Sequence, residues 1–364
     1  MQHYYQHNNS NVHRGAHKLA ERATASFDES REKVQRAIHA SSSREIVFTK
    51  GCTESLNLVA QTWGRANLRA GDLVLLSHME HHANIVSWQL VCEQVGARIE
   101  PIPITDEGEI DLEAYQKLLE MSPRVVGVVH VSNSLGTVNP IKKMAAMAHD
   151  SGAIFVADGA QALAHLAVDV VDLGVDFYSL SAHKAYGPTG VGALYGREEL
   201  LEAMPPFMGG GDMIKTVSFE KTTFADLPSK FEPGTPNIAG VVGWGAALDF
   251  MLEMDMNAAW RHEDELLHVT TERLLQVPGL KILGNAKDKV AVISFVMDAA
   301  HPHDIGTVLD QQAIAIRTGH HCCMPLMKRL GINGTARASL AMYNTHEEID
   351  YLVRGLDRVI EVFA

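Results

Sequence analysis

Between about residues 44 and 196, short apolar runs alternate with longer stretches that have the periodicity of helices. The runs are rich in β-branched and aromatic residues, which is typical of buried strands. They lie at residues 45–49, 73–76, 125–129, 153–157, 177–180 and 191–195. Helical stretches between them include residues 84–95 and 111–119. This alternation predicts an α/β fold in which helices cover both faces of a mainly parallel sheet.

The pattern changes after the segment Gly234-Thr-Pro-Asn237. The chain then reads as helical to about Val277, shows apolar runs at residues 290–295 and 313–316, and ends in a helical stretch over 345–362. A chain of 364 residues is longer than the size at which a single core usually stops growing. We therefore expect a large domain over residues 1–249, a smaller α+β domain over residues 250–364, and a long helix that bridges them.

The composition argues against several classes of partner. The formal net charge is −13, and no run of Lys or Arg is long enough to follow a nucleic-acid backbone. No apolar stretch approaches the roughly 20 residues that a membrane helix needs, and the polar N-terminus lacks the apolar core of a signal peptide. The four cysteines are too few for a disulfide framework in a chain of this length. We expect a cytoplasmic protein that binds neither nucleic acid nor a membrane.

Two polar residues directly follow predicted strands, which is where parallel sheets bind ligands. Lys184 lies in the turn Ser181-Ala-His-Lys-Ala-Tyr-Gly-Pro188. A lysine held partly out of water can act as an amine nucleophile, although a surface lysine in a turn is the ordinary interpretation of one such residue. Asp158 follows the strand before it. It could cap a helix, or it could face the pyridine nitrogen of pyridoxal 5′-phosphate (PLP), which is a better electron sink when protonated.

A glycine turn in the segment Thr49-Lys-Gly-Cys-Thr-Glu-Ser55 opens a predicted helix. The backbone N–H groups at a helix N-terminus can cradle a phosphate, but plain helix capping also explains such a segment.

The segment Arg317-Thr-Gly-His-His-Cys-Cys-Met-Pro325 places Cys322 beside basic residues, which favour a reactive thiolate. A structural zinc site is the competing interpretation of the same residues. Four consecutive residues cannot readily surround one ion, and no second ligand pair at a suitable spacing follows. We therefore expect no metal here.

Together these segments resemble the cysteine desulfurases, and among them the SufS type, which are PLP enzymes of fold type I (the aspartate-aminotransferase fold) in the class-V aminotransferase family. The resemblance extends over almost the whole chain, in the order that the family has. The matching segments are residues 12–15, 79–86, 130–133, 157–161, 181–190, 231–237, 317–322 and 337–345.

The resemblance implies a cofactor site that holds PLP. The residues concerned are Lys184 as the Schiff-base lysine, Asp158 at the pyridine nitrogen, Gln161 and Asn133 on the O3′ side, His81 stacked on the ring, and Thr53, Ser181 and His183 at the phosphate. Thr235 is expected to reach the phosphate from the other subunit of a homodimer. Because His81 and His82 are adjacent, we expect only one of them, His81, to take this catalytic position.

The resemblance also implies the reaction, which converts L-cysteine to L-alanine. Lys184 takes the Cα proton, and Cys322 accepts the sulfur as a persulfide. The substrate carboxylate is expected to pair with Arg337, with Asn133, Arg317 and His13 lining the same pocket. A SufE- or SufU-like acceptor then passes the sulfur to iron–sulfur cluster assembly.

Two departures from the family pattern leave alternatives open. Cys323 stands where resembling proteins commonly have Ala, and it could either share the persulfide or fill a small site. Family members usually begin with a further segment, so we expect that this chain is short at its N-terminus. The alternatives are a selenocysteine lyase, another PLP-dependent β-lyase, or an inactive scaffold with the PLP fold.

Overall fold

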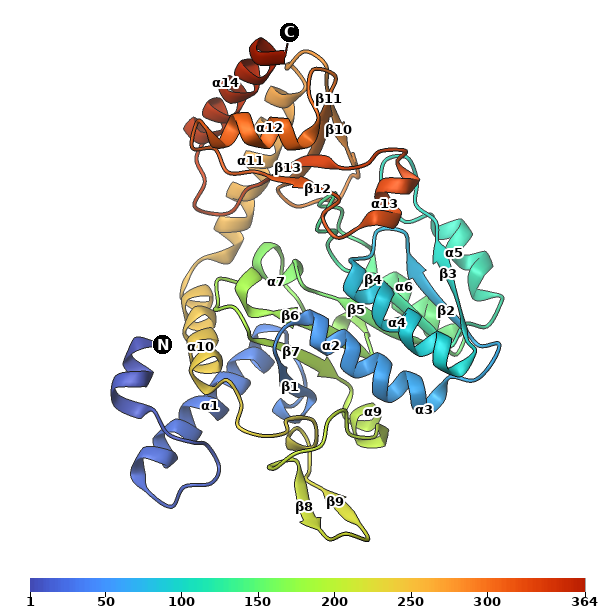
Figure 1. Ribbon diagram of the computed structural model, residues 1–364, viewed down its shortest axis with the longest axis vertical. Helices are drawn as coiled ribbons and strands as arrows, with labels where there is room; N and C mark the ends of the chain where they lie inside the picture. The colour runs from blue at the N-terminus through green and yellow to red at the C-terminus, as the bar shows by residue number, and fades with distance from the viewer. Residues whose placement is uncertain (364) are drawn as a thin grey trace.

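A seven-stranded sheet forms the centre of the larger part of the molecule (Figure 1). The computed structural model describes residues 1–363. The strand order is β1-β7-β6-β5-β4-β2-β3. The strands are β1 (Ile46–Thr49), β2 (Leu73–Ser77), β3 (Arg98–Ile102), β4 (Val125–Val129), β5 (Ile154–Asp158), β6 (Phe177–Ser181) and β7 (Gly192–Gly196). Strand β7 runs antiparallel to both β1 and β6, and the other pairs are parallel. The predicted mainly parallel sheet is therefore confirmed, and so are its six predicted strands.

The side chains of each strand divide between two cores, because successive residues point to opposite faces of a sheet. In β5, Phe155 and Ala157 belong to one core and Val156 to the other. Both faces are covered by helices, which explains why these strands read as continuous apolar runs. The first core includes residues of α1 (Lys18–Ala37), α5 (Leu112–Leu119), α6 (Ile141–Asp150) and α10 (Ile238–Glu253). The second includes residues of α2 (Cys52–Val59), α4 (His82–Val95) and α9 (Glu198–Ala203).

Strand β3 was not predicted from the sequence. It pairs with β2 alone and forms an edge of the sheet. Its residues Arg98 to Pro101 are exposed or half-exposed, so it lacks the apolar run of a central strand. Proline is tolerated in such an edge strand because the missing N–H need not pair.

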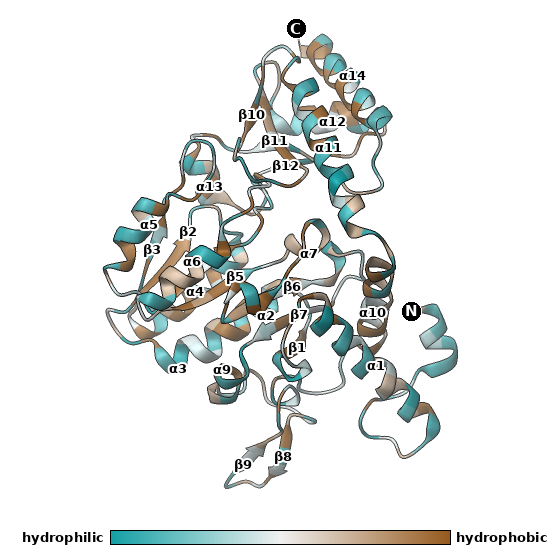
Figure 2. Ribbon diagram, turned by 180° about the vertical axis from the view of Figure 1, so that it is seen from behind, coloured by the Kyte–Doolittle hydropathy of each residue, from teal (hydrophilic) through white to brown (hydrophobic). Residues whose placement is uncertain are grey.

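The smaller part contains a four-stranded antiparallel sheet in the order β10-β11-β13-β12. Its strands are β10 (Leu280–Leu283), β11 (Val292–Met297), β12 (Arg317–Gly319) and β13 (Thr335–Ser339). It packs with α11 (Met256–Leu274), α12 (Pro302–Asp310) and α14 (His346–Phe363). Figure 2 shows α14 as a mixture of hydrophilic and hydrophobic residues, and its buried residues, Ile349, Leu352, Leu356 and Val359 among them, recur at helical spacing.

Two predictions for this part were wrong. The apolar run at residues 313–316 is not a strand, because Ala313 has a φ of 58°, which a strand cannot accommodate, and β12 begins only at Arg317. The single bridging helix is two helices, since α10 ends at Glu253 and α11 begins at Met256. Asp255 caps the second helix by accepting a hydrogen bond from the Ala258 N–H (3.0 Å).

The segment that carries Cys322 and Cys323 packs against the larger part of the molecule. Helix α13 (Met324–Arg329) places Leu326 and Met327 in the core of the large sheet, together with Cys323. Cys322 and Cys323 therefore lie where the two parts of the molecule meet. The domain boundary near residue 250 stays a prediction.

The remaining elements are short. They are the helices α3 (Arg65–Asn67), α7 (Ala162–His165) and α8 (Val170–Leu173), the 3-10 turns η2 (Ser43–Glu45), η4 (Ala182–Lys184) and η5 (Ser229–Phe231), the π-helical turns η1 (Tyr4–Asn8) and η3 (Ala60–Gly64), and the hairpin β8 (Ile214–Val217) and β9 (Thr222–Phe224). The hairpin projects away from the sheet in Figure 1. Within residues 1–363, no helix is both long and apolar enough to cross a membrane.

Candidate active site

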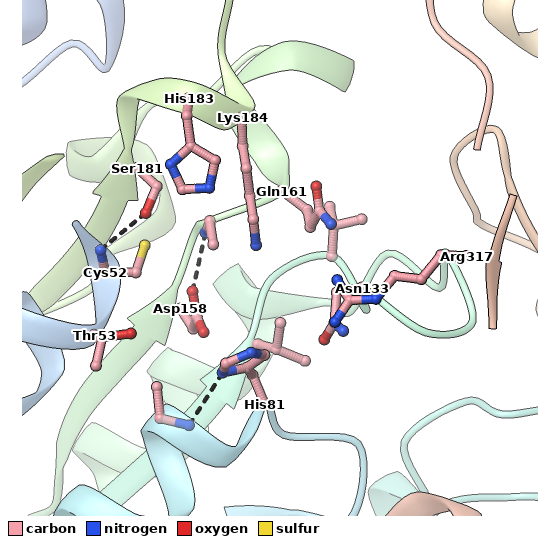
Figure 3. Close-up of a pocket in the computed structure, with 14 residues that line it drawn as sticks. Cys52, Thr53, His81, Asn133, Asp158, Gln161, Ser181, His183, Lys184 and Arg317 are labelled. Carbon is pink, nitrogen blue, oxygen red and sulfur yellow. Dashed lines mark hydrogen bonds between the residues drawn. The ribbon is translucent and has the colours of Figure 1, made fainter. Parts of the chain in front are cut away.

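A cavity of about 240 Å³ lies beyond the carboxyl ends of β4, β5 and β6 (Figure 3). Nine of the residues singled out in the sequence line it, and they come from six separate stretches of the chain. They are Thr53, His81, Asn133, Asp158, Gln161, Ser181, His183, Lys184 and Arg317. The parallel strands bring most of these residues together because their carboxyl ends meet at one edge of the sheet, whereas Arg317 comes from β12 of the smaller sheet.

Lys184 and Asp158 enter the cavity from neighbouring strands. Asp158 is the last residue of β5, is 2% exposed, and accepts a hydrogen bond from the Ala160 N–H (3.0 Å). Lys184 ends the 3-10 turn that follows β6 and is half-buried. In Figure 3 the lysine amine extends into the same space as the Asp158 carboxylate. A buried carboxylate and an amine so placed suit a ligand that carries both a protonated ring nitrogen and an electrophilic carbonyl.

The first turn of α2 forms another wall of the cavity. Gly51 precedes the helix with φ 148° and ψ 176°, and a Cβ there would lie 3.3 Å from Ser181 Oγ. The Cys52 N–H donates to Ser181 Oγ (2.9 Å), so the serine hydroxyl keeps its own proton for a ligand. Burial raises the pKa of Cys52 to about 12, which keeps this thiol uncharged. Helix N–H groups and a free hydroxyl make a suitable phosphate site, although Glu54 lies in the same first turn of the helix.

His81 lines the cavity as a neutral ring. It is the N-cap residue of α4, and its Nδ1 accepts a hydrogen bond from the Ala83 N–H (3.1 Å), which leaves the proton on Nε2. Burial lowers its pKa, although the Asp158 carboxylate acts in the opposite direction. The adjacent His82 does not line the cavity, and its Nε2 accepts a hydrogen bond from the Met324 N–H (3.0 Å). His81 is therefore the histidine that can lie against a flat ring.

Cys322 lies outside the cavity lining, but Arg317 links it to the cavity. Arg317 Nη2 is 3.7 Å from Cys322 Sγ, and the same side chain lines the cavity. The Cys322 carbonyl accepts a hydrogen bond from the His82 N–H (2.8 Å), which ties the cysteine loop to the start of α4. Cys322 is half-exposed, whereas Cys323 is fully buried. Of the two thiols, Cys322 is the one that a substrate can reach.

Arg337 lies opposite Arg317 on the neighbouring strand. It does not line the cavity itself, but it contacts Asn133, which does. Its Nη1 donates to the Asn133 carbonyl, and its buried Nε has no hydrogen-bond partner within residues 1–363. Burial, with a further contribution from Arg317, lowers the pKa of Arg337 to about 10. A buried guanidinium with a free donor is suited to a carboxylate ligand.

Comparison with known proteins places this geometry in a family. The model of the aminotransferase class-V family matches residues 1–352. The chain belongs to the class-V aminotransferases. Its relatives include the cysteine desulfurase of Synechococcus elongatus, which is 46% identical over 99% of this chain and 57% of its own length. The cysteine desulfurase of Salmonella typhimurium is 48% identical over 98% of this chain and 88% of its own length. The chain thus spans little more than half of the first relative and most of the second.

Solved structures agree with this membership. The apo structure of a cysteine desulfurase from Thermococcus onnurineus superposes with a TM-score of 0.95 at 39% identity, covering 99% of this chain and 90% of the other. The predicted fold class, PLP fold type I, is confirmed by this likeness.

Class-V aminotransferases depend on PLP, and the residues of this cavity fit that cofactor. Lys184 offers the amine, Asp158 a buried acid, and the first turn of α2 with Ser181 a phosphate cradle. Among residues 1–363, no group of three or more His, Cys, Asp or Glu side chains is arranged to hold a metal ion.

Besides Cys322 and Arg337, two further residues predicted for this site, His13 and Thr235, do not line the cavity. His13 Nε2 lies 3.4 Å from Asp28 Oδ1, and His13 lines a separate cavity of about 130 Å³. Thr235 lines another cavity of about 460 Å³, near Lys50 and Glu54. Thr235 was expected to act on the partner subunit of a dimer. The roles of both residues stay predictions.

Some buried polar residues near the cavity were not predicted from the sequence. Glu80 is fully buried and accepts hydrogen bonds from Asn84 Nδ2 (2.7 Å) and the Val129 N–H (2.8 Å). Burial raises its pKa to about 8. The acid beside His81 and His82 was visible in the sequence, but nothing in it indicated burial. Tyr178, whose hydroxyl lies 2.7 Å from His130 Nδ1, was hidden in the apolar run of β6.

Proposed function

We propose that this chain is a cysteine desulfurase of the SufS type, which converts L-cysteine to L-alanine and takes up the sulfur as a persulfide on Cys322. One observation carries the proposal: Arg317 joins the cavity of Lys184 and Asp158 to a half-exposed thiol, with Nη2 3.7 Å from Cys322 Sγ. An aminotransferase needs no such thiol. The SufS-like segments around Lys184, Cys322 and Arg337 support the narrower assignment.

The residues that would hold PLP follow from the cavity. Lys184 would bind it covalently, Asp158 would pair with the ring nitrogen, and Ser181 with the first turn of α2 would bind the phosphate. His81, held neutral by its burial, would lie against the ring. PLP bound there would withdraw electrons from the Cα atom of the amino-acid substrate.

Each of the remaining steps is assigned to a side chain of the protein. Arg337, with Nε free, and Arg317 bind the substrate carboxylate and orient the amino acid. Lys184 removes the Cα proton as a general base, since it is the lysine that lines the cavity. Cys322, as the thiolate, attacks the substrate sulfur, so that a new S–S bond forms while the Cβ–S bond breaks. The electron pair of the broken bond stays with the three-carbon fragment, which gains a proton and leaves as alanine.

The half-exposed Cys322 suits delivery of the sulfur to another protein. We propose that the acceptor is a SufE- or SufU-like protein that supplies iron–sulfur cluster assembly, and that the working form is a homodimer. Thr235 does not line the Lys184 cavity of its own chain. This position fits the dimer, in which Thr235 of one subunit would reach the phosphate site of the other.

The test compares the holoenzyme with Cys322→Ser and with a control, Cys92→Ser, which alters a buried thiol in α4. Each is mixed with L-cysteine, alanine is quantified, and the protein mass is measured without reductant. The parent and the control should gain the mass of sulfur and release alanine. Cys322→Ser should keep the visible absorbance of bound PLP but gain no sulfur. Unchanged alanine release by that variant would contradict the proposal, whereas pyruvate formed in place of alanine would indicate a β-lyase.

Two further measurements separate the remaining activities. Alanine formed from selenocysteine, with and without a sulfur acceptor, shows whether a lyase activity exceeds the desulfurase activity. A preparation that stays colourless after PLP is added would instead identify an inactive scaffold.

A further inference from the structure

The two adjacent cysteines have opposite environments. His321 and Cys322 both have positive φ angles (52° and 60°), and this tight turn directs the two thiols apart. Cys322 is half-exposed, whereas Cys323 is 0% exposed and packs with the core of the large sheet. The Cys323 thiol lies 3.3 Å from Asn133 Oδ1, 3.5 Å from the His321 carbonyl and 4.0 Å from the Met79 carbonyl. Cys323, and not Cys322, therefore contacts the wall of the active site.

The same loop fixes the amide of Asn133. Asn133 Nδ2 donates to the His321 carbonyl (2.7 Å), while Oδ1 accepts from the Cys323 thiol. Turning the amide over would set Oδ1 against the His321 carbonyl, where two acceptors repel. An asparagine amide has two N–H groups, so one remains for a ligand. Asn133 lines the cavity together with Arg317, one of the two arginines proposed to bind the substrate carboxylate.

The Cys323 thiol is chemically suited to this structural task. Burial raises its pKa to about 12, so it stays protonated and donates to Asn133 Oδ1. A protonated thiol is a poor nucleophile and a poor sulfur acceptor. Its surroundings offer a hydrogen-bond acceptor and apolar side chains, such as Leu326 and Met327, and no route to solvent.

We propose that Cys323 is a positioning residue that holds the Asn133 amide toward the substrate carboxylate, and that it carries no sulfur itself. This inference rests on the proposed function, because it assumes an amino-acid substrate. The thiol acts through Asn133 and touches neither substrate nor cofactor. Losing the S–H should therefore weaken substrate binding more than it slows the chemical step.

Steady-state kinetics of the holoenzyme with L-cysteine provide the main test. Cys323→Ala should raise KM about three- to tenfold, the range of one lost hydrogen bond, and leave kcat within about twofold. Cys323→Ser keeps a donor and should restore KM to within about twofold of the parent. Cys92→Ala, which truncates another buried thiol away from the cavity, should leave KM unchanged. An unchanged KM in Cys323→Ala, or a Cys323→Ser variant no better than Cys323→Ala, would overturn the proposal.

A second measurement tests whether Cys323 carries sulfur. The Cys322→Ser variant is incubated with L-cysteine, and its peptides are mapped by mass spectrometry. Cys323 should gain no sulfur, and sulfur found on it would refute the positioning role as stated. If the parent releases no alanine at all, the proposed function fails instead. Titration of the PLP absorbance with L-alanine then still compares amino-acid binding between the parent and Cys323→Ala.

Discussion

The Arg317 guanidinium lies between the cavity and the exposed thiol, with Nη2 3.7 Å from Cys322 Sγ. Arg317 begins β12, and strand pairing with β13 sets it opposite Arg337. Two cations thus lie side by side: Arg317 lines the cavity and contacts the thiol, and Arg337 contacts the Asn133 carbonyl. A guanidinium in this place attracts a sulfur that carries negative charge, as well as a substrate carboxylate.

Replacing Arg317 should therefore slow the reaction of Cys322 even when no substrate is present. In Arg317→Ala, we expect alkylation of Cys322 by iodoacetamide at pH 7 to be slower by about tenfold, which corresponds to about 1.4 kcal/mol of lost charge stabilisation. Arg317→Lys keeps the charge, so its alkylation rate should lie between those of the parent and Arg317→Ala. The rate is followed by mass spectrometry of the Cys322 peptide. Equal rates in the parent and Arg317→Ala would show that the contact does not activate the thiol.

Replacing Lys184 tests the cofactor bond. Lys184→Ala should lose the pH-dependent visible absorbance of the holoenzyme, because no other lysine lines the cavity within residues 1–363. Lys289→Ala is a control at another buried lysine. Burial lowers the pKa of Lys289 to about 8, but this side chain lines a different cavity and its Nζ donates to the Gly284 carbonyl. Borohydride reduction followed by peptide mapping locates the modified lysine. A labelled peptide other than that of Lys184 would overturn the assignment.

Much of the large domain could be predicted because its strands are buried on both faces. Strands such as β4 and β5 are continuous apolar runs, and the polar residues that follow them mark the edge where ligands bind. Strand β3 was missed because it lies at the edge of the sheet and is partly exposed. The strand near residue 313 was misplaced, since nothing in the sequence shows that Ala313 has a positive φ.

Nine of the predicted site residues line one cavity, but the contacts that hold them there were not predicted. Asn133 was expected near the cofactor, and it does line the cavity. Its partners, however, are the His321 carbonyl and the Cys323 thiol, nearly 200 residues further along the chain. Backbone partners leave no sequence signature, because any residue supplies a carbonyl. The burial of Glu80 could not be foreseen for a related reason, since the backbone N–H of Val129 is one of its donors.

The buried Glu80 should make stability depend on pH. Its pKa is raised from 4.5 to about 8 in the folded chain, so between these values the folded state holds a proton that the unfolded state has released. Stability from this group is full below pH 4.5 and falls by about 1.4 kcal/mol per pH unit as the pH rises toward 8. Urea unfolding at several pH values should show that Glu80→Gln lacks this loss, whereas Glu113→Gln, on the exposed face of α5, retains it. Parallel pH profiles for the parent and Glu80→Gln would contradict the assignment.

The turn after Asp158 depends on the absence of a side chain at Gly159. A Cβ on Gly159 would lie 1.9 Å from Tyr178 Cε1 and 2.6 Å from its hydroxyl oxygen. Tyr178 cannot move aside, because it is fully buried and its hydroxyl lies 2.7 Å from His130 Nδ1. The backbone at Asp158 would have to shift instead. Overpacking of this kind costs about 1–3 kcal/mol, so Gly159→Ala should lower the melting temperature by several degrees.

The same substitution should weaken PLP binding, because the displaced turn carries the Asp158 carboxylate away from the cavity. Gly209→Ala is the matched control, since a Cβ there meets nothing within 4 Å. Thermal unfolding and a PLP titration are measured on both variants. We expect Gly159→Ala to bind PLP at least about tenfold more weakly than the control, which corresponds to about 1.4 kcal/mol. A Gly159→Ala variant that matches Gly209→Ala in both measurements would show that Tyr178 does not fix the position of Asp158.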